Sequence, residues 1–124
     1  MSENIGKAVP YIWFICVGVL SLLPGSYKAH LHTRGLLHTP GHIVVFAVSA
    51  FLACRSVRVI PRRGFLSLAV IGYGGVLEAL QSWLWRSRLE WDDVASDACG
   101  VLLVFVFATW AEAVRKMRRP ESGL

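Results

Sequence analysis

Charged residues are scarce in this chain of 124 residues: Lys, Arg, Asp and Glu together make up 17% of it, whereas 55% of its residues are hydrophobic. A soluble domain of this size keeps much of its surface in contact with water, so it cannot bury that many apolar side chains. The scarcity of charge therefore excludes an ordinary soluble fold. The length suits one domain, residues 1–124, and is too short for a transporter built from two large halves.

Cysteine is rare, and the common catalytic motifs are missing. The three cysteines form no CxxC pair, and their odd number excludes a complete disulfide framework. The sequence has no HExxH motif, no GxSxG motif and no glycine-rich phosphate loop. Of the four histidines, only His38 and His42 are spaced to share a helical face, while His30 and His32 fall in an expected loop. We therefore expect no metal site and no cofactor.

Acidic residues are fewer than basic ones, 8 against 13, which gives a net charge of +5. A basic protein can bind nucleic acid, but this sequence has no groove-reading or base-stacking motif. Its basic residues instead lie between apolar stretches and near the C-terminus, where membrane proteins carry Lys and Arg as topology determinants. The charge predicts membrane lipids as partners and no nucleic acid.

Long apolar stretches are what the chain has in abundance, at about residues 8–23, 37–54, 65–85 and 94–114. Each is near the length that a helix needs to cross a bilayer. No small-x-small cleavage site follows the first stretch, so we interpret it as a retained span rather than a signal peptide. The pattern predicts an all-α integral membrane four-helix bundle, in which short loops make successive helices antiparallel.

The distribution of Lys and Arg predicts the orientation of the spans. Nine of them lie in the N-terminal tail, the loop between the second and third spans and the C-terminal tail, against four in the other two loops. Because cytoplasmic segments carry the excess of basic residues, both termini are expected in the cytoplasm. The nine are Lys7, Arg55, Arg58, Arg62, Arg63, Arg115, Lys116, Arg118 and Arg119, and the four are Lys28, Arg34, Arg86 and Arg88.

A few polar residues interrupt the apolar stretches, and the predicted topology brings them all near the outer surface of the membrane. They are His42 near the start of the second span, Glu78 and Gln81 near the end of the third, and Asp93 and Asp97 at the start of the fourth. Spacings of three and four residues put each pair on one helix face.

Two interpretations of these polar residues remain open. Polar side chains in lipid often do no more than bond one helix to another. They also mark cavities that bind a polar ligand or exchange protons. In either case the acids need partners, which His42, Arg86 and Arg88 can supply. Gly100, one turn beyond Asp97, is expected to let another helix approach closely.

The spacing of these residues resembles the signature of the VanZ-like family of small bacterial membrane proteins. That signature reads E-x-x-Q, a loop arginine, then D-x-x-x-N/D-x-x-G. Glu78 and Gln81 are similar to the first part, and Arg86 or Arg88 is similar to the loop arginine. The stretch from Asp93 through Asp97 to Gly100 is similar to the last part. His42 is similar to the histidine that opens the family's second span. The resemblance implies a four-helix, multi-pass protein of the bacterial cytoplasmic membrane. It also implies a link to glycopeptide resistance, because the founding member is associated with resistance to teicoplanin.

Our leading hypothesis is a non-enzymatic protein of the cell envelope with an outward-facing polar pocket. The pocket would bind a lipid-linked, peptidoglycan-related or other amphiphilic ligand through His42, Glu78, Gln81, Arg86, Arg88, Asp93 and Asp97. One alternative is a membrane enzyme that acts on a lipid headgroup, with Glu78 or Asp93 as general base and Arg88 holding a phosphate. Another is a proton-coupled carrier of small molecules, which would need to oligomerise to build a pathway from four spans.

Overall fold

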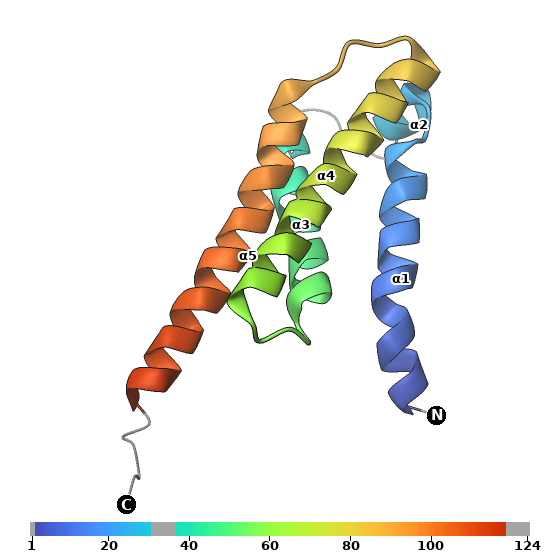
Figure 1. Cartoon of the computed structure of the whole chain (residues 1–124). Helices are drawn as coiled ribbons and strands as arrows, with labels where there is room; N and C mark the ends of the chain where they lie inside the picture. The colour runs from blue at the N-terminus through green and yellow to red at the C-terminus, as the bar shows by residue number, and fades with distance from the viewer. Residues whose placement is uncertain (1, 31–36, 119–124) are drawn as a thin grey trace, which may run out of the picture.

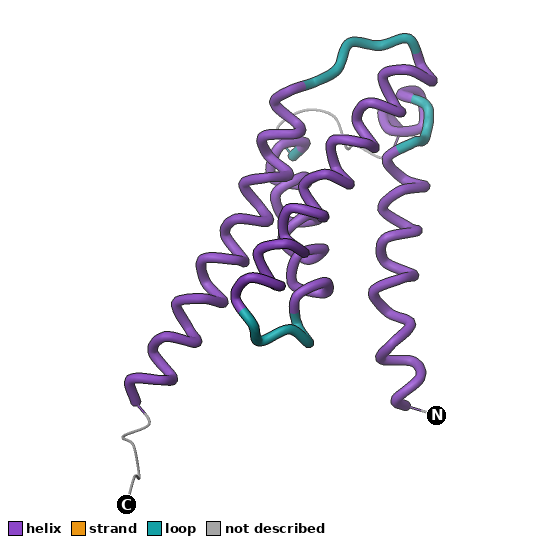
Figure 2. The backbone as a smooth tube through the Cα atoms, viewed as in Figure 1, coloured by secondary structure: helices purple, strands orange, loops and turns teal. Residues whose placement is uncertain are grey.

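The computed structural model describes residues 2–30 and 37–118, without the side chains of residues 2–5 and 28–30. It is all-helical, as the sequence predicts, and these residues contain no strand (Figures 1 and 2). The helices are α1 (Ser2–Ser21), α2 (Gly25–His30), α3 (His38–Cys54), α4 (Ile60–Trp85) and α5 (Trp91–Arg118). His32, Arg34 and Arg119 lie outside the described residues, as do the side chains of Lys28 and His30.

The helices differ from the predicted spans mainly at their ends. The helix α3 starts one residue later than predicted and ends where predicted, whereas α4 starts five residues earlier. Pro61 explains the early start, because proline is tolerated in a first helical turn. Both α1 and α5 continue into polar sequence beyond their apolar stretches. The short helix α2 is not predicted by the apolar pattern, because it has only six residues.

The long helices α1, α3, α4 and α5 alternate in direction along the chain (Figure 1). The start of α1, the end of α5 and the 55–59 loop therefore lie at one end of the molecule, which we call the terminal end. The opposite end carries α2 and the 86–90 loop, and we call it the loop end (Figure 2). Because α3 and α5 both start at the loop end, they run parallel to each other. They form the most extensive helix contact, α4 packs on both, and α1 packs on α3 and α4.

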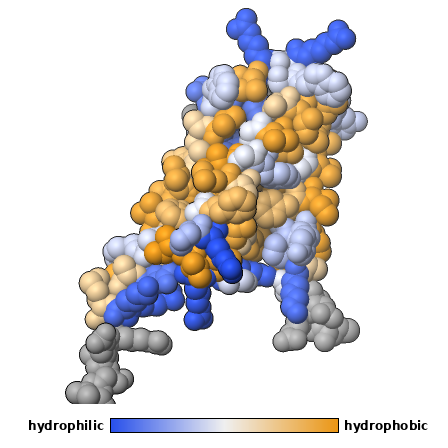
Figure 3. All heavy atoms as spheres, in the orientation of Figure 1, coloured by the Kyte–Doolittle hydropathy of each residue, from blue (hydrophilic) through white to orange (hydrophobic). Residues whose placement is uncertain are grey.

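Two helices, α4 and α5, are long and apolar enough to span a membrane by length and composition. The apolar parts of α1 (Gly6–Ser21) and α3 are shorter. At 1.5 Å per residue, the 17 residues of α3 reach about 26 Å, close to the thickness of a bilayer's hydrocarbon core. On the face seen in Figure 3, hydrophobic side chains form a band between two hydrophilic ends.

The core lies where α3, α4 and α5 meet, around Phe46, Ala50, Val70 and Val101. Gly100 permits the closest approach, because a Cβ atom at this position would lie 2.2 Å from the carbonyl oxygen of Ile43 in α3. Small residues at helix crossings are the usual way for membrane helices to gain van der Waals contact, since lipid supplies no hydrophobic force between them.

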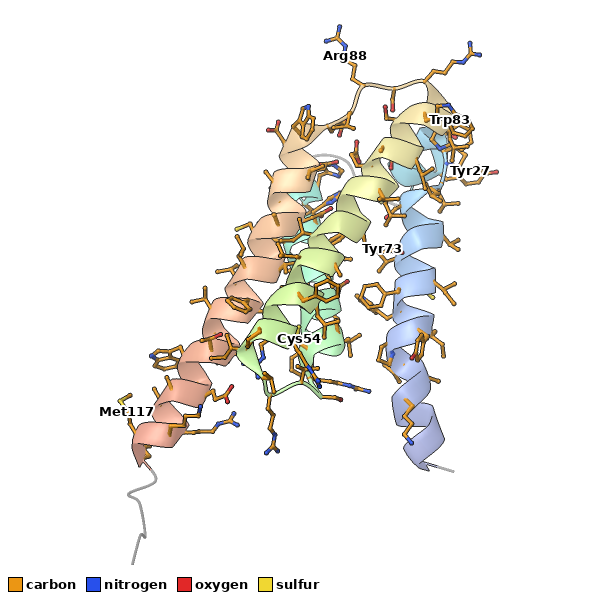
Figure 4. The ribbon with its side chains drawn as sticks, in the orientation of Figure 1. Tyr27, Cys54, Tyr73, Trp83, Arg88 and Met117 are labelled. Carbon is orange, nitrogen blue, oxygen red and sulfur yellow. The ribbon has the colours of Figure 1, made fainter. Side chains whose placement is uncertain are left out.

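Hydrogen bonds attach α1 to the other helices. The indole Nε1 of Trp13 donates to Oγ of Ser49 in α3 at 2.9 Å, and the Tyr73 hydroxyl of α4 donates to the carbonyl oxygen of Phe14 at 2.6 Å. Figure 4 shows Tyr73 in the space between α4 and α1. Because α1 has the fewest packing contacts of the long helices, these bonds set its position.

A buried ion pair closes the terminal end. Arg63 is only 8% exposed, and its Nη1 lies 3.1 Å from Oε2 of Glu112 in α5. Its Nη2 donates to the carbonyl oxygen of Val57 at 2.8 Å. From the sequence Arg63 is expected only to act as a topology determinant, but its side chain also connects α4, α5 and the 55–59 loop. The spacing of apolar residues along the sequence does not indicate which arginine is buried.

We predict that Gly100→Ala lowers the free energy of unfolding by about 1–3 kcal/mol, because the methyl group meets backbone atoms that cannot rotate away. Gly75→Ala is the matched control, since a Cβ atom there has nothing within 4 Å. Alanine is the better helix former, so the control variant should be as stable as the wild type or more stable by up to about 1 kcal/mol. Thermal unfolding in detergent measures both. Equal stability of the two variants would contradict the close α3–α5 contact.

Candidate functional site

Polar side chains from three helices and one loop converge at the loop end. We call this group the loop-end cluster. Its members are His38 and His42 of α3, Glu78 of α4, Glu90 of the 86–90 loop, and Asp93 and Asp97 of α5. Four of the six were predicted from the sequence to lie together, and His38 and Glu90 were not included in that prediction.

His42 and Asp97 form the shortest contact in the cluster, 2.7 Å between Nδ1 and Oδ1. A carboxylate can only accept, so the imidazole carries its proton on Nδ1 and donates it to Asp97. In the neutral ring the other nitrogen, Nε2, carries the lone pair, and it lies 3.7 Å from Oδ2 of Asp93. Asp97 is 4% exposed and therefore holds the ring from the interior side.

His38 makes the second histidine–carboxylate contact, one helical turn before His42. Its Nε2 lies 3.0 Å from Oδ2 of Asp93 and 4.0 Å from Oε2 of Glu90. The two imidazole rings meet edge to face, with centroids 4.8 Å apart. The spacing of four residues between the histidines is the sequence signal that could have identified His38 as a member of the cluster.

Glu78 secures the loop that leads into α5. Its side chain is buried at 6% exposure, and Oε1 accepts a hydrogen bond from the backbone N–H of Glu90 at 3.0 Å. Gln81 lies one turn further along α4 and is half-buried. Partial burial raises the pKa of the Glu90 carboxyl above its usual range, and the carboxylates of Asp93 and Glu78 raise it further. The acidic groups of Glu78, Glu90 and Asp93 therefore lie close together at this end of the bundle.

The two loop arginines do not join the cluster. Both are exposed, and Figure 4 shows the Arg88 side chain extending away from the helices. Within residues 37–118 neither Arg86 nor Arg88 forms an ion pair, so the expected pairing with the acids does not occur in this structure. Arg86 instead ends α4, with a left-handed φ of 49° and its N–H bonded to the carbonyl oxygen of Ser82.

Exposure increases toward the loop end. Asp93 and Asp97 are buried, the histidine side chains are about one-third exposed, and Glu90 is 59% exposed. A ligand arriving from the loop end would meet Glu90 and the histidines first. The arrangement can accept hydrogen bonds, hold a cation, or use His42 as a base that Asp97 orients.

No family model, no curated protein and no solved structure matches the chain.

We predict that the Glu78 side chain stabilises the fold as an acceptor more than as a charge. Glu78→Gln keeps an oxygen for the Glu90 N–H and should change stability by less than about 1 kcal/mol, whereas Glu78→Leu leaves that N–H unpaired and should cost about 1–3 kcal/mol. Chemical or thermal unfolding of the purified variants measures the difference. If both variants lose stability equally, the acceptor role is wrong and the charge itself stabilises the fold.

Proposed function

We propose that the chain is a VanZ-like protein of the bacterial cytoplasmic membrane, with α1, α3, α4 and α5 as four spans. The apolar band between hydrophilic ends and the alternating helix directions support the four spans (Figures 1 and 3). The spacing of Glu78, Gln81, Asp93, Asp97 and Gly100 supports the family. The 17 residues of α3 are at the lower limit for a span, and its polar first turn would lie at the membrane surface.

The proposed orientation puts the terminal end in the cytoplasm. Arg55, Arg58 and Arg62 lie at or beside the 55–59 loop, and α5 ends with Arg115, Lys116 and Arg118. The 86–90 loop contributes only Arg86 and Arg88. This asymmetry follows the positive-inside rule, so the loop-end cluster would face the outer side.

A fusion experiment tests the orientation. Green fluorescent protein fused after Leu124 should fluoresce, and alkaline phosphatase fused there should be inactive, because both report a cytoplasmic C-terminus. Alkaline phosphatase inserted after Arg88 should be active. The reverse pattern would put the loop-end cluster in the cytoplasm and overturn the proposed topology.

We propose that the loop-end cluster binds the polar head of a lipid-linked or other amphiphilic ligand of the cell envelope, without catalysis. The observation that carries this proposal is a group of buried carboxylates at the end of an otherwise apolar bundle, reached through the partly exposed histidines and the exposed Glu90. Carboxylates accept hydrogen bonds from sugar hydroxyls and amines, which are the donors of glycosylated and peptide-bearing headgroups. The exposed Trp83 and Trp91 near the same end would lie beside the ligand at the interface.

Binding in detergent tests this function. A polyprenyl-diphosphate-linked disaccharide pentapeptide should bind, and polyprenyl phosphate without the sugar should bind more weakly. Asp93→Asn should weaken binding of the first ligand about 10- to 150-fold, since one lost hydrogen bond to a charged group is worth about 1.5–3 kcal/mol. Asp92→Asn, at an exposed position in the same turn, is the control and should bind normally. Equal binding of both ligands by all three proteins, measured by native mass spectrometry, would contradict the proposal.

A membrane enzyme acting on a lipid headgroup is the second candidate, and the His42–Asp97 contact favours it. An imidazole oriented by a buried carboxylate is a common general base. Turnover of a labelled lipid precursor by the purified protein, abolished by His42→Gln, would select the enzyme over the binding protein.

A further inference from the structure

We propose that His38, His42 and Asp93 bind a divalent transition-metal ion, and that Zn²⁺ suits this ligand set best. One ligand atom from each of the three residues lies within 4.8 Å of the other two. In a tetrahedral zinc site with metal–ligand distances of about 2.0–2.2 Å, neighbouring ligand atoms are about 3.3–3.6 Å apart. The 3.0 Å and 3.7 Å that separate Asp93 Oδ2 from the two histidine Nε2 atoms bracket this range.

A neutral His42 ring that donates its Nδ1–H to Asp97 presents the lone pair of Nε2 toward Asp93, where the ion would lie. His38 Nε2 lies 3.0 Å from Asp93 Oδ2, so the proton that it donates to this carboxylate would leave when the ion binds. The site therefore needs His42 as it is oriented and a deprotonated Nε2 on His38. Metal-binding histidines almost always donate their second N–H to a carboxylate or carbonyl, which fixes the ring and strengthens it as a ligand. Asp97 is therefore a positioning residue for His42 in the proposed site.

The charge of the cluster also favours a cation. Four carboxyl groups, from Glu78, Glu90, Asp93 and Asp97, converge on two imidazoles. Across the described part of the chain, none of the four forms an ion pair with Lys or Arg. A dication bound between Asp93 and the histidines would compensate this excess of negative charge.

The proposed site is open on one side. His38 and His42 are half-buried and Glu90 is exposed, so the fourth coordination position would face the loop end. Water or the Glu90 carboxylate can fill it. Three protein ligands with an accessible fourth position are typical of zinc sites that bind external ligands.

This inference departs from the expectation of no metal site, which followed from the missing HExxH motif. The stretch from His38 to His42 keeps the i, i+4 histidine spacing of that motif without its glutamate. The third ligand follows 51 residues after His42, so only the packing of α5 on α3 shows the set.

Zinc binding by the purified full-length chain tests the proposal, with a purification tag that contains no histidine. We expect one tightly bound Zn²⁺ per chain by elemental analysis and calorimetry. His38→Ala and His42→Ala should each weaken binding at least about 100-fold, and Asp97→Asn about 10- to 100-fold through the loss of the second-shell bond. Ca²⁺ and Mg²⁺ should not compete, because imidazole ligands select transition metals.

Two controls separate this site from other ligands in the chain. Asp92→Asn and the double variant His30→Ala/His32→Ala should bind Zn²⁺ as the wild type does. If a variant does not fold, X-ray absorption spectroscopy of the zinc-loaded wild type tests the ligands instead. Its spectrum should show two imidazole ligands on the zinc ion. The proposal would be overturned by a zinc stoichiometry well below one per chain or by wild-type zinc affinity in His42→Ala. Loss of zinc binding in either control, or an X-ray absorption spectrum without imidazole ligands, would also overturn it.

Discussion

The close parallel contact between α3 and α5 is the constraint on which the other features of this structure depend. Gly100 brings the two backbones together at Ile43 and Ala47. Because the helices run in the same direction, residues at a constant offset of 55 face each other, His38 opposite Asp93 and His42 opposite Asp97. A larger residue at Gly100 would separate both pairs at once. The packing contact and the polar cluster are therefore one structural unit.

The helix α4 packs on α3 and α5 and also leaves space for the Asp97 side chain. A Cβ atom at Gly74 of α4 would lie 2.7 Å from Oδ2 of Asp97 and 2.8 Å from the Phe46 ring. The carboxylate of Asp97, which orients His42, thus occupies the space that a side chain at Gly74 would need. Burial of an acid in an apolar bundle is costly unless it is hydrogen-bonded, and the His42 N–H satisfies Asp97 where α4 leaves space for it.

The two ends of the molecule use charge in different ways. At the terminal end, the buried Arg63 pairs with Glu112 and the other basic residues nearby are exposed. At the loop end, carboxylates gather around half-buried imidazoles, while Arg86 and Arg88 extend into solvent. The first arrangement neutralises its buried charge with an arginine, and the second pairs its buried carboxylates with partly exposed imidazoles and leaves Glu90 exposed.

The sequence predicts the helical class, the position of α3 to within one residue and the gathering of His42, Glu78, Asp93 and Asp97, because apolar length and the spacing of polar residues can be read along the chain. Helix packing accounts for the rest, namely the exposed loop arginines, the buried Arg63 and the inclusion of His38 and Glu90. Each depends on which face of one helix meets another, and on a left-handed residue at Arg86 that sets the course of the loop. Spacing along one helix cannot specify the partner across the contact, because the offset between α3 and α5 arises from their packing at Gly100.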